Sequence, residues 1–101
     1  MEFLVSIQVN PGADGGTARW EGLMLDERRR GQDLQAQGWL RRIWRVPGRM
    51  ANVALYEARD ATHLHELLTS LPLWPWMDVA VQPLAQHPLE RPEASPPPPA
   101  T

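Results

Sequence analysis

Residues 20–34 read WEGLMLDERRRGQDL, and this stretch sets the pattern from which the fold is inferred. Wound as a helix at about 100° per residue, it gathers apolar or small side chains on one stripe. The stripe consists of Trp20, Leu23, Met24, Gly31 and Leu34. Glu27 falls inside it, seven residues from both Trp20 and Leu34. A carboxylate that faces a core must be desolvated, so Glu27 needs a compensating partner or a chemical role.

Periodicity alone leaves two interpretations of Glu27 open. It could be a structural residue paired with an arginine, or a general base in a dry pocket. The neighbouring charges Asp26, Arg28 and Arg29 lie off the stripe and indicate an ordinary solvated face. Glu27 is therefore the misplaced charge, and the groups around it decide between the two interpretations.

Further elements are predicted on both sides of this helix. Alternating apolar residues predict strands over residues 3–9, 39–46, 51–56 and 77–81. Pro83 is expected to stop the last of these strands. Turn formers fill residues 10–16, Thr17 is expected to cap the first helix, and Gly38 to follow its end. Asp60 is expected to cap a second helix over residues 61–71, closed by Pro72 and Pro75.

The order strand, helix, strand, strand, helix, strand predicts an α+β fold of the ferredoxin-like type. Its antiparallel sheet would carry both helices on one face. The other face of such a sheet is often covered by a second subunit. Five tryptophans in a chain of 101 residues favour this, because a small core leaves apolar surface to cover.

Length and composition narrow the function classes. We expect one domain over residues 1–88 and a disordered Pro-rich tail over residues 89–101. The net charge of −2 offers no attraction for nucleic acid or an anionic membrane. No cysteine is present, which excludes disulfides and thiolate catalysis. The chain begins without a secretory-signal pattern and has no membrane-spanning apolar run, so a soluble cytoplasmic protein is expected.

Arginines and an asparagine on the predicted hairpin could surround Glu27. Strict alternation puts Arg41 and Arg45 on one side of strand 39–46, and Arg42 and Trp44 on the other. Some of these arginines could simply protect a sheet edge, whereas one near Glu27 could bind a substrate carboxylate or stabilise an enolate. Asn52 could orient a substrate, or make only a local hydrogen bond.

Other kinds of site find little support in the sequence. His63 and His65 flank opposite edges of the second helix, which is not a metal-binding spacing, although His65 could line a pocket. His87 could cap the site of a neighbouring subunit. There is no glycine-rich phosphate loop and no serine-triad context, so no cofactor or metal is expected. The function classes that remain are acid/base catalysis and ligand binding.

Several short motifs resemble those of the muconolactone Δ-isomerase family, over residues 1–88. They are Asp26-Glu27, Ile43-Trp44-Arg45 with Gly48, Ala51-Asn52, Leu64-His65, Leu71-Pro72-Leu73 with Pro75, Met77-Asp78 and His87-Pro88. The resemblance implies a ferredoxin-like fold that dimerises through its sheets into an α+β barrel. It also implies a homo-oligomer, a decamer, whose pockets are completed by a neighbouring chain.

The same resemblance implies a cofactor-free isomerase of aromatic catabolism, in the β-ketoadipate pathway, acting on a small lactone. It would convert muconolactone to 3-oxoadipate enol-lactone, with Glu27 moving the proton and Arg45 or Arg41 stabilising charge and anchoring the carboxylate. Trp44, Asn52 and His65 would line the pocket.

Departures from the family pattern leave the substrate and the function class open. They are Trp39, Arg42, Arg49, Met50 and Trp76. They allow a chlorinated lactone or another small acid with an acidic carbon-bound proton. Two other classes stay possible: a cofactor-free monooxygenase or polyketide cyclase of the same dimeric fold, and a non-catalytic assembly or ligand-binding module. In the module, Glu27 would be paired with an arginine and inaccessible.

Overall fold

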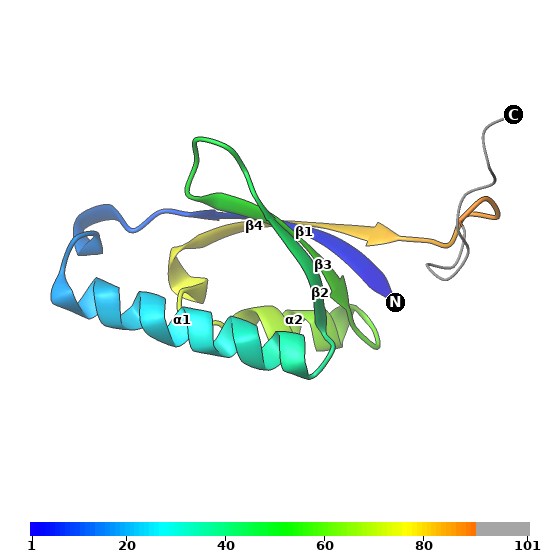
Figure 1. The fold of residues 1–101 in the computed structure, drawn as a ribbon, viewed down its shortest axis with the longest axis horizontal. Helices are drawn as coiled ribbons and strands as arrows, with labels where there is room; N and C mark the ends of the chain where they lie inside the picture. The colour runs from blue at the N-terminus through cyan, green and yellow to red at the C-terminus, as the bar shows by residue number, and fades with distance from the viewer. Residues whose placement is uncertain (91–101) are drawn as a thin grey trace, which may run out of the picture.

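A four-stranded antiparallel sheet with two α-helices on one face forms the protein (Figure 1). The computed structural model describes residues 1–90. The elements are β1 (Glu2–Val9), η1 (Gly12–Asp14), α1 (Ala18–Ala36), β2 (Leu40–Arg45), β3 (Ala51–Glu57), α2 (Ala61–Thr69), η2 (Trp74–Trp76) and β4 (Met77–Leu84). The strand order is β2-β3-β1-β4. This is the ferredoxin-like arrangement, so the predicted fold class is confirmed.

The central strands β1 and β3 determine which side chains face the helices. In β1, Phe3, Val5 and Ile7 are buried, because alternate side chains of a strand lie on the same face of the sheet. They pair with Tyr56, Ala54 and Asn52 of β3. The row of β3 that faces the helices therefore ends in a polar residue, Asn52.

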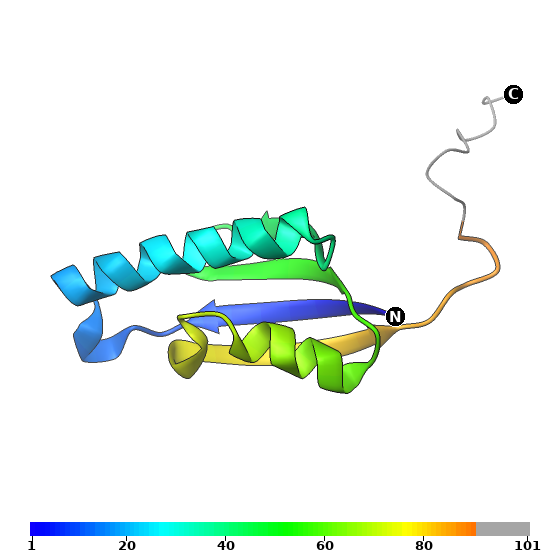
Figure 2. The same ribbon diagram turned by 90° about the horizontal axis from the view of Figure 1, so that it is seen from below.

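Both helices begin at the predicted caps. The hydroxyl of Thr17 accepts the Trp20 N–H at 3.1 Å, and Oδ1 of Asp60 accepts the His63 N–H at 2.7 Å. In Figure 2, α1 lies along the β2–β3 side of the sheet and α2 along the β4 side. α2 packs its leucine stripe into the core, whereas α1 is anchored mainly near its two ends.

The apolar stripe predicted for α1 is only partly buried. Trp20 and Leu34 are buried, but Met24, between them, is 46% exposed. The expectation of a continuous core-facing stripe was therefore wrong at its centre. The reason is that the middle of α1 faces a cavity above the sheet, and Met24 and Gly31 line that cavity.

The expected uninterrupted alternation of strand 39–46 was also wrong. Leu40 pairs with Tyr56 and Arg42 with Leu55, so the register shifts by one residue at Arg41. Such a bulge places two residues opposite one and reverses the facing of those that follow. Ile43 and Arg45 consequently pair with Ala54 and Asn52, on the side of the helices.

The remaining differences lie at the ends of elements. α2 ends at Thr69, before the predicted residue 71. The short helix η1 occupies the segment predicted as a turn, and η2 lies between the second helix and the last strand, where no element was predicted. β4 continues through Pro83, which is tolerated because β4 is an edge strand. Within residues 1–90, no helix has the length and apolar character needed to cross a membrane. The predicted tail lies mostly outside the described residues.

Candidate active site

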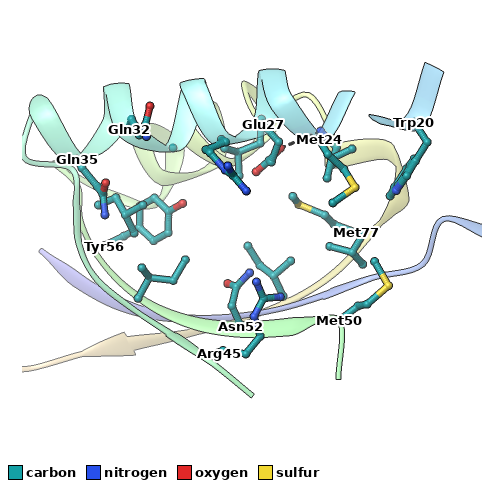
Figure 3. Close-up of a pocket in the computed structure, with 18 residues that line it drawn as sticks. Trp20, Met24, Glu27, Gln32, Gln35, Arg45, Met50, Asn52, Tyr56 and Met77 are labelled. Carbon is teal, nitrogen blue, oxygen red and sulfur yellow. Dashed lines mark hydrogen bonds between the residues drawn. The ribbon is translucent and has the colours of Figure 1, made fainter. Parts of the chain in front are cut away.

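A cavity of about 430 Å³ opens between α1 and the sheet (Figure 3). It is lined by residues from α1, all four strands and the segment that follows α2. Its polar lining consists of Glu27, Arg28, Gln32, Gln35, Arg45, Asn52 and Tyr56. A cavity of this volume suits a small organic molecule and lies at the lower end of the range for ligand sites.

Glu27 projects from the middle of α1 into this cavity (Figure 3). Its Oε1 accepts a hydrogen bond of 3.0 Å from the backbone N–H of Leu73. Burial raises the pKa of the Glu27 carboxyl above its usual 4.5, although the Leu73 N–H favours the charged form. Across residues 1–90, no cation forms an ion pair with Glu27. The interpretation of Glu27 as one half of a buried structural pair with arginine thus has no support.

Arg45 and Asn52 face each other across β2 and β3, beneath α1. Both side chains line the cavity, so the bulge settles which arginine of the strand reaches it. Oδ1 of Asn52 is buried and has no hydrogen-bond partner in the part of the chain that the structure describes. A buried polar atom left unpaired costs about 1–3 kcal/mol, and such a cost is commonly tolerated where a ligand supplies the partner.

Tyr56 is a cavity residue that sequence reasoning missed. Its side chain is 2% exposed and lines the cavity from β3. Burial, together with the charge of Glu27, raises the pKa of the Tyr56 hydroxyl to about 12, with Arg30 opposing the shift. The signal was present in the sequence: Asn52, Ala54 and Tyr56 alternate along one strand, so a site containing Asn52 also contains Tyr56.

Comparison with known proteins identifies the family. A family model described as "Muconolactone delta-isomerase" matches residues 1–90. The chain belongs to the muconolactone Δ-isomerase family. A muconolactone Δ-isomerase 2 of Acinetobacter lwoffii is 40% identical over 87 residues, 86% of this chain and 91% of the relative.

Other members and a solved structure agree with this membership. A muconolactone Δ-isomerase of Pseudomonas aeruginosa is 36% identical over 88 residues, 87% of this chain and 92% of that protein. A crystal structure of muconolactone isomerase superposes with a TM-score of 0.82 at 36% identity, covering 89% of this chain and 94% of the other. The predicted family is therefore confirmed, together with its fold.

Three candidate residues named for the muconolactone Δ-isomerase resemblance lie outside the cavity lining of the single chain. Arg41 sits exposed at the bulge of β2. Trp44 is 45% exposed on the opposite face of the sheet, where the Arg42 guanidinium lies 5.0 Å from its ring. His65 is exposed on α2, with its ring 6.1 Å from that of Trp74. Their roles as substrate contacts remain predictions.

The structure also places three of the positions that depart from the muconolactone Δ-isomerase pattern. Met50 lines the cavity, with Met24 and Met77 at the same end (Figure 3). Trp76 donates its Nε1–H to Asp14 at 3.0 Å and packs edge-on against Trp20, which lines the cavity. Trp39 packs against the buried His63. One end of the cavity is therefore rich in deformable thioether groups.

Proposed function

We propose that this protein is a cofactor-free isomerase that converts muconolactone to 3-oxoadipate enol-lactone in aromatic catabolism. The observation that carries the proposal is the state of Glu27: a carboxylate with a raised pKa, held by one backbone donor, facing a cavity. A carboxylate of this kind can accept a proton from carbon and return it to another carbon. The names of the relatives support muconolactone as the substrate.

In the proposed reaction, Glu27 removes a proton from the ring carbon that bears the carboxymethyl group. The electron pair of that C–H bond delocalises through the C=C bond to the lactone carbonyl, which gives a dienolate. Glu27 then returns the proton to the carbon next to the carbonyl, so the double bond moves and no electrons are gained or lost. Arg45 anchors the substrate carboxylate and offsets the developing charge.

The size of the cavity favours this function over the alternatives. A monooxygenase or polyketide cyclase acting on polycyclic aromatics would need a larger and more apolar space than about 430 Å³. A non-catalytic module with Glu27 paired and inaccessible is disfavoured by the carboxylate that lines the cavity. The methionine end also suits a substituted lactone, such as a chlorinated one, as a second substrate.

Assembly belongs to the same proposal. Leu4, Val53, Leu55 and Trp44 alternate with the residues that face the helices, so they form an apolar stripe on the open face of the sheet. We expect a second copy to cover it, giving the dimeric α+β barrel, and dimers to assemble into a decamer. The cavity is open near Ile43, which is 47% exposed, and a neighbouring chain could close it there. A cytoplasmic location is part of this proposal.

The test is turnover of (+)-muconolactone by the purified protein, its Glu27→Gln variant and a matched control. Glu21→Gln serves as the control because it removes an exposed carboxylate from the same helix. We expect wild type and Glu21→Gln to produce enol-lactone, and Glu27→Gln to lose at least roughly 10²–10⁴ in rate, the usual contribution of a general base. A folded wild-type protein that leaves muconolactone unchanged would overturn the substrate, and an active Glu27→Gln would overturn the base.

A further inference from the structure

We propose that the hydroxyl of Tyr56 is a catalytic group that donates a hydrogen bond to the lactone carbonyl oxygen and stabilises the dienolate. This inference rests on the proposed isomerase function and adds a residue to it. Neither the motifs of the family resemblance nor the arginines considered as charge stabilisers include Tyr56.

The first support is the placement of the side chain. Tyr56 lies between Phe3 on β1 and Leu40 on β2, and all three belong to the buried core, so its ring is confined on the face of the sheet toward the helices. Its hydroxyl points into the cavity, which Glu27 enters from α1 (Figure 3). A ring held in this way presents its donor without further loss of side-chain freedom when a ligand binds.

The second support is that the Tyr56 hydroxyl makes no hydrogen bond to any of the described residues. None of residues 1–90 donates to it or accepts from it, although the side chain is 2% exposed. Protein atoms do not fully enclose this oxygen, unlike the unpartnered Oδ1 of Asn52. The oxygen therefore borders the open space of the cavity. A molecule that fills the cavity would therefore meet a free donor.

The third support is the protonation state. With a pKa of about 12, the phenol stays neutral at neutral pH and keeps its proton as a donor. The negative charge of Glu27 contributes to raising the Tyr56 pKa, so the two groups interact electrostatically. When Glu27 takes the substrate proton, its negative charge moves to the lactone oxygen, and a neutral donor at that oxygen is favoured in the transition state.

The chemistry of the step balances without ionisation of Tyr56. The C–H bond breaks toward Glu27, the electron pair moves to the carbonyl oxygen, and the Tyr56 O–H strengthens its hydrogen bond to that oxygen. On return of the proton to carbon the hydrogen bond weakens again. Arg45 remains available for the substrate carboxylate, so the two negative groups of the intermediate have separate partners.

The test is Tyr56→Phe, which removes the hydroxyl and retains the ring that packs against Phe3 and Leu40. We expect kcat on muconolactone to fall roughly 10²–10³-fold, as when one oxyanion donor is removed, with KM nearly unchanged. Thr69→Val is the matched control, because it removes a hydroxyl that bonds within α2 and does not line the cavity. Circular dichroism and thermal melting confirm that both variants fold.

A binding measurement separates this assignment from the choice of substrate. Tetronate is a five-membered lactone that carries an enolate, and 2(5H)-furanone is its neutral counterpart. We expect Tyr56→Phe to weaken tetronate binding at least tenfold while furanone binding changes little. This result supports Tyr56 even if wild type leaves muconolactone unchanged, an outcome that would overturn only the proposed substrate. A wild type that binds no tetronate, or a Tyr56→Phe variant that binds it equally well, overturns the assignment of Tyr56.

Discussion

The backbone N–H of Leu73 donates a hydrogen bond of 3.0 Å to Oε1 of Glu27, across 46 positions of the sequence. Leu73 is buried and lies between α2 and η2, so the bond ties this segment to the middle of α1. A single backbone donor orients the carboxylate, yet burial outweighs it and leaves the Glu27 pKa raised. This arrangement supports the proposed role of Glu27 as the base, because the carboxylate is held in position and its pKa is raised.

The pH dependence of activity is expected to report the raised pKa of Glu27. Because the base must be deprotonated, kcat/KM should rise with pH and then reach a plateau. The midpoint of the rise should lie above pH 4.5, the ordinary pKa of glutamate. Tyr56 keeps its proton to about pH 12 and should not limit the alkaline side near neutrality. Initial rates on muconolactone across the acidic and neutral range measure the midpoint. A midpoint at or below 4.5 would contradict the assignment.

Stability should depend on pH in the direction opposite to that of an ion-paired glutamate. The folded-state pKa of Glu27 exceeds its unfolded value, so between the two values the folded protein binds more protons and stability falls as pH rises. The favourable contribution is complete below the unfolded pKa and is lost above the folded one. Glu27→Gln mimics the protonated form and can still accept the Leu73 N–H.

We therefore expect Glu27→Gln to raise the free energy of unfolding at neutral pH, and the difference from wild type to vanish on acidification below about 4.5. Urea unfolding of both proteins at neutral and acidic pH measures it. Glu21→Gln, on the exposed side of α1, should show no such difference. A Glu27→Gln variant less stable than wild type at neutral pH would show that the charge is stabilising.

The sequence was sufficient to predict the fold and to single out Glu27, which lines the cavity, because both predictions depend on patterns along the chain. Strand alternation, the caps Thr17 and Asp60, and the misplaced Glu27 are all readable along the chain. The bulge at Arg41 was not readable, because a register shift is fixed by pairing with another strand. That shift decides that Arg45 reaches the cavity, and the register of β3 decides that Tyr56 does.

Arg45 and Arg41 lie on the same strand, but only Arg45 lines the cavity. Substituting each one should therefore have a different effect on the kinetics. Arg45 lines the cavity, so Arg45→Met removes a charge-assisted contact of about 1.5–3 kcal/mol and should raise KM for muconolactone roughly tenfold to a hundredfold. Arg41 sits at the bulge outside the lining, so Arg41→Met should change kcat/KM less than about threefold. Steady-state kinetics of the two variants decide. Equal effects would mean that Arg41 reaches a substrate site in the assembled protein.

Trp44 allows a test of the expected sheet-to-sheet dimer. It is 45% exposed on the face of the sheet opposite the helices and pairs with Val53, which extends the apolar stripe. Trp44→Glu would bury a charge without a partner if a second copy covers this face, at a cost that small interfaces cannot offset. We expect wild type to be a homo-oligomer by light scattering, and Trp44→Glu to shift toward smaller species.

Leu25→Glu is the control for this substitution, because Leu25 is 54% exposed on α1 and does not line the cavity. It introduces the same charge on the helical side of the molecule and should leave the oligomer intact. Dissociation by both variants would mean that the helices also contribute to assembly. If the wild type is a monomer, or if Trp44→Glu assembles normally, the open face of the sheet is not the interface.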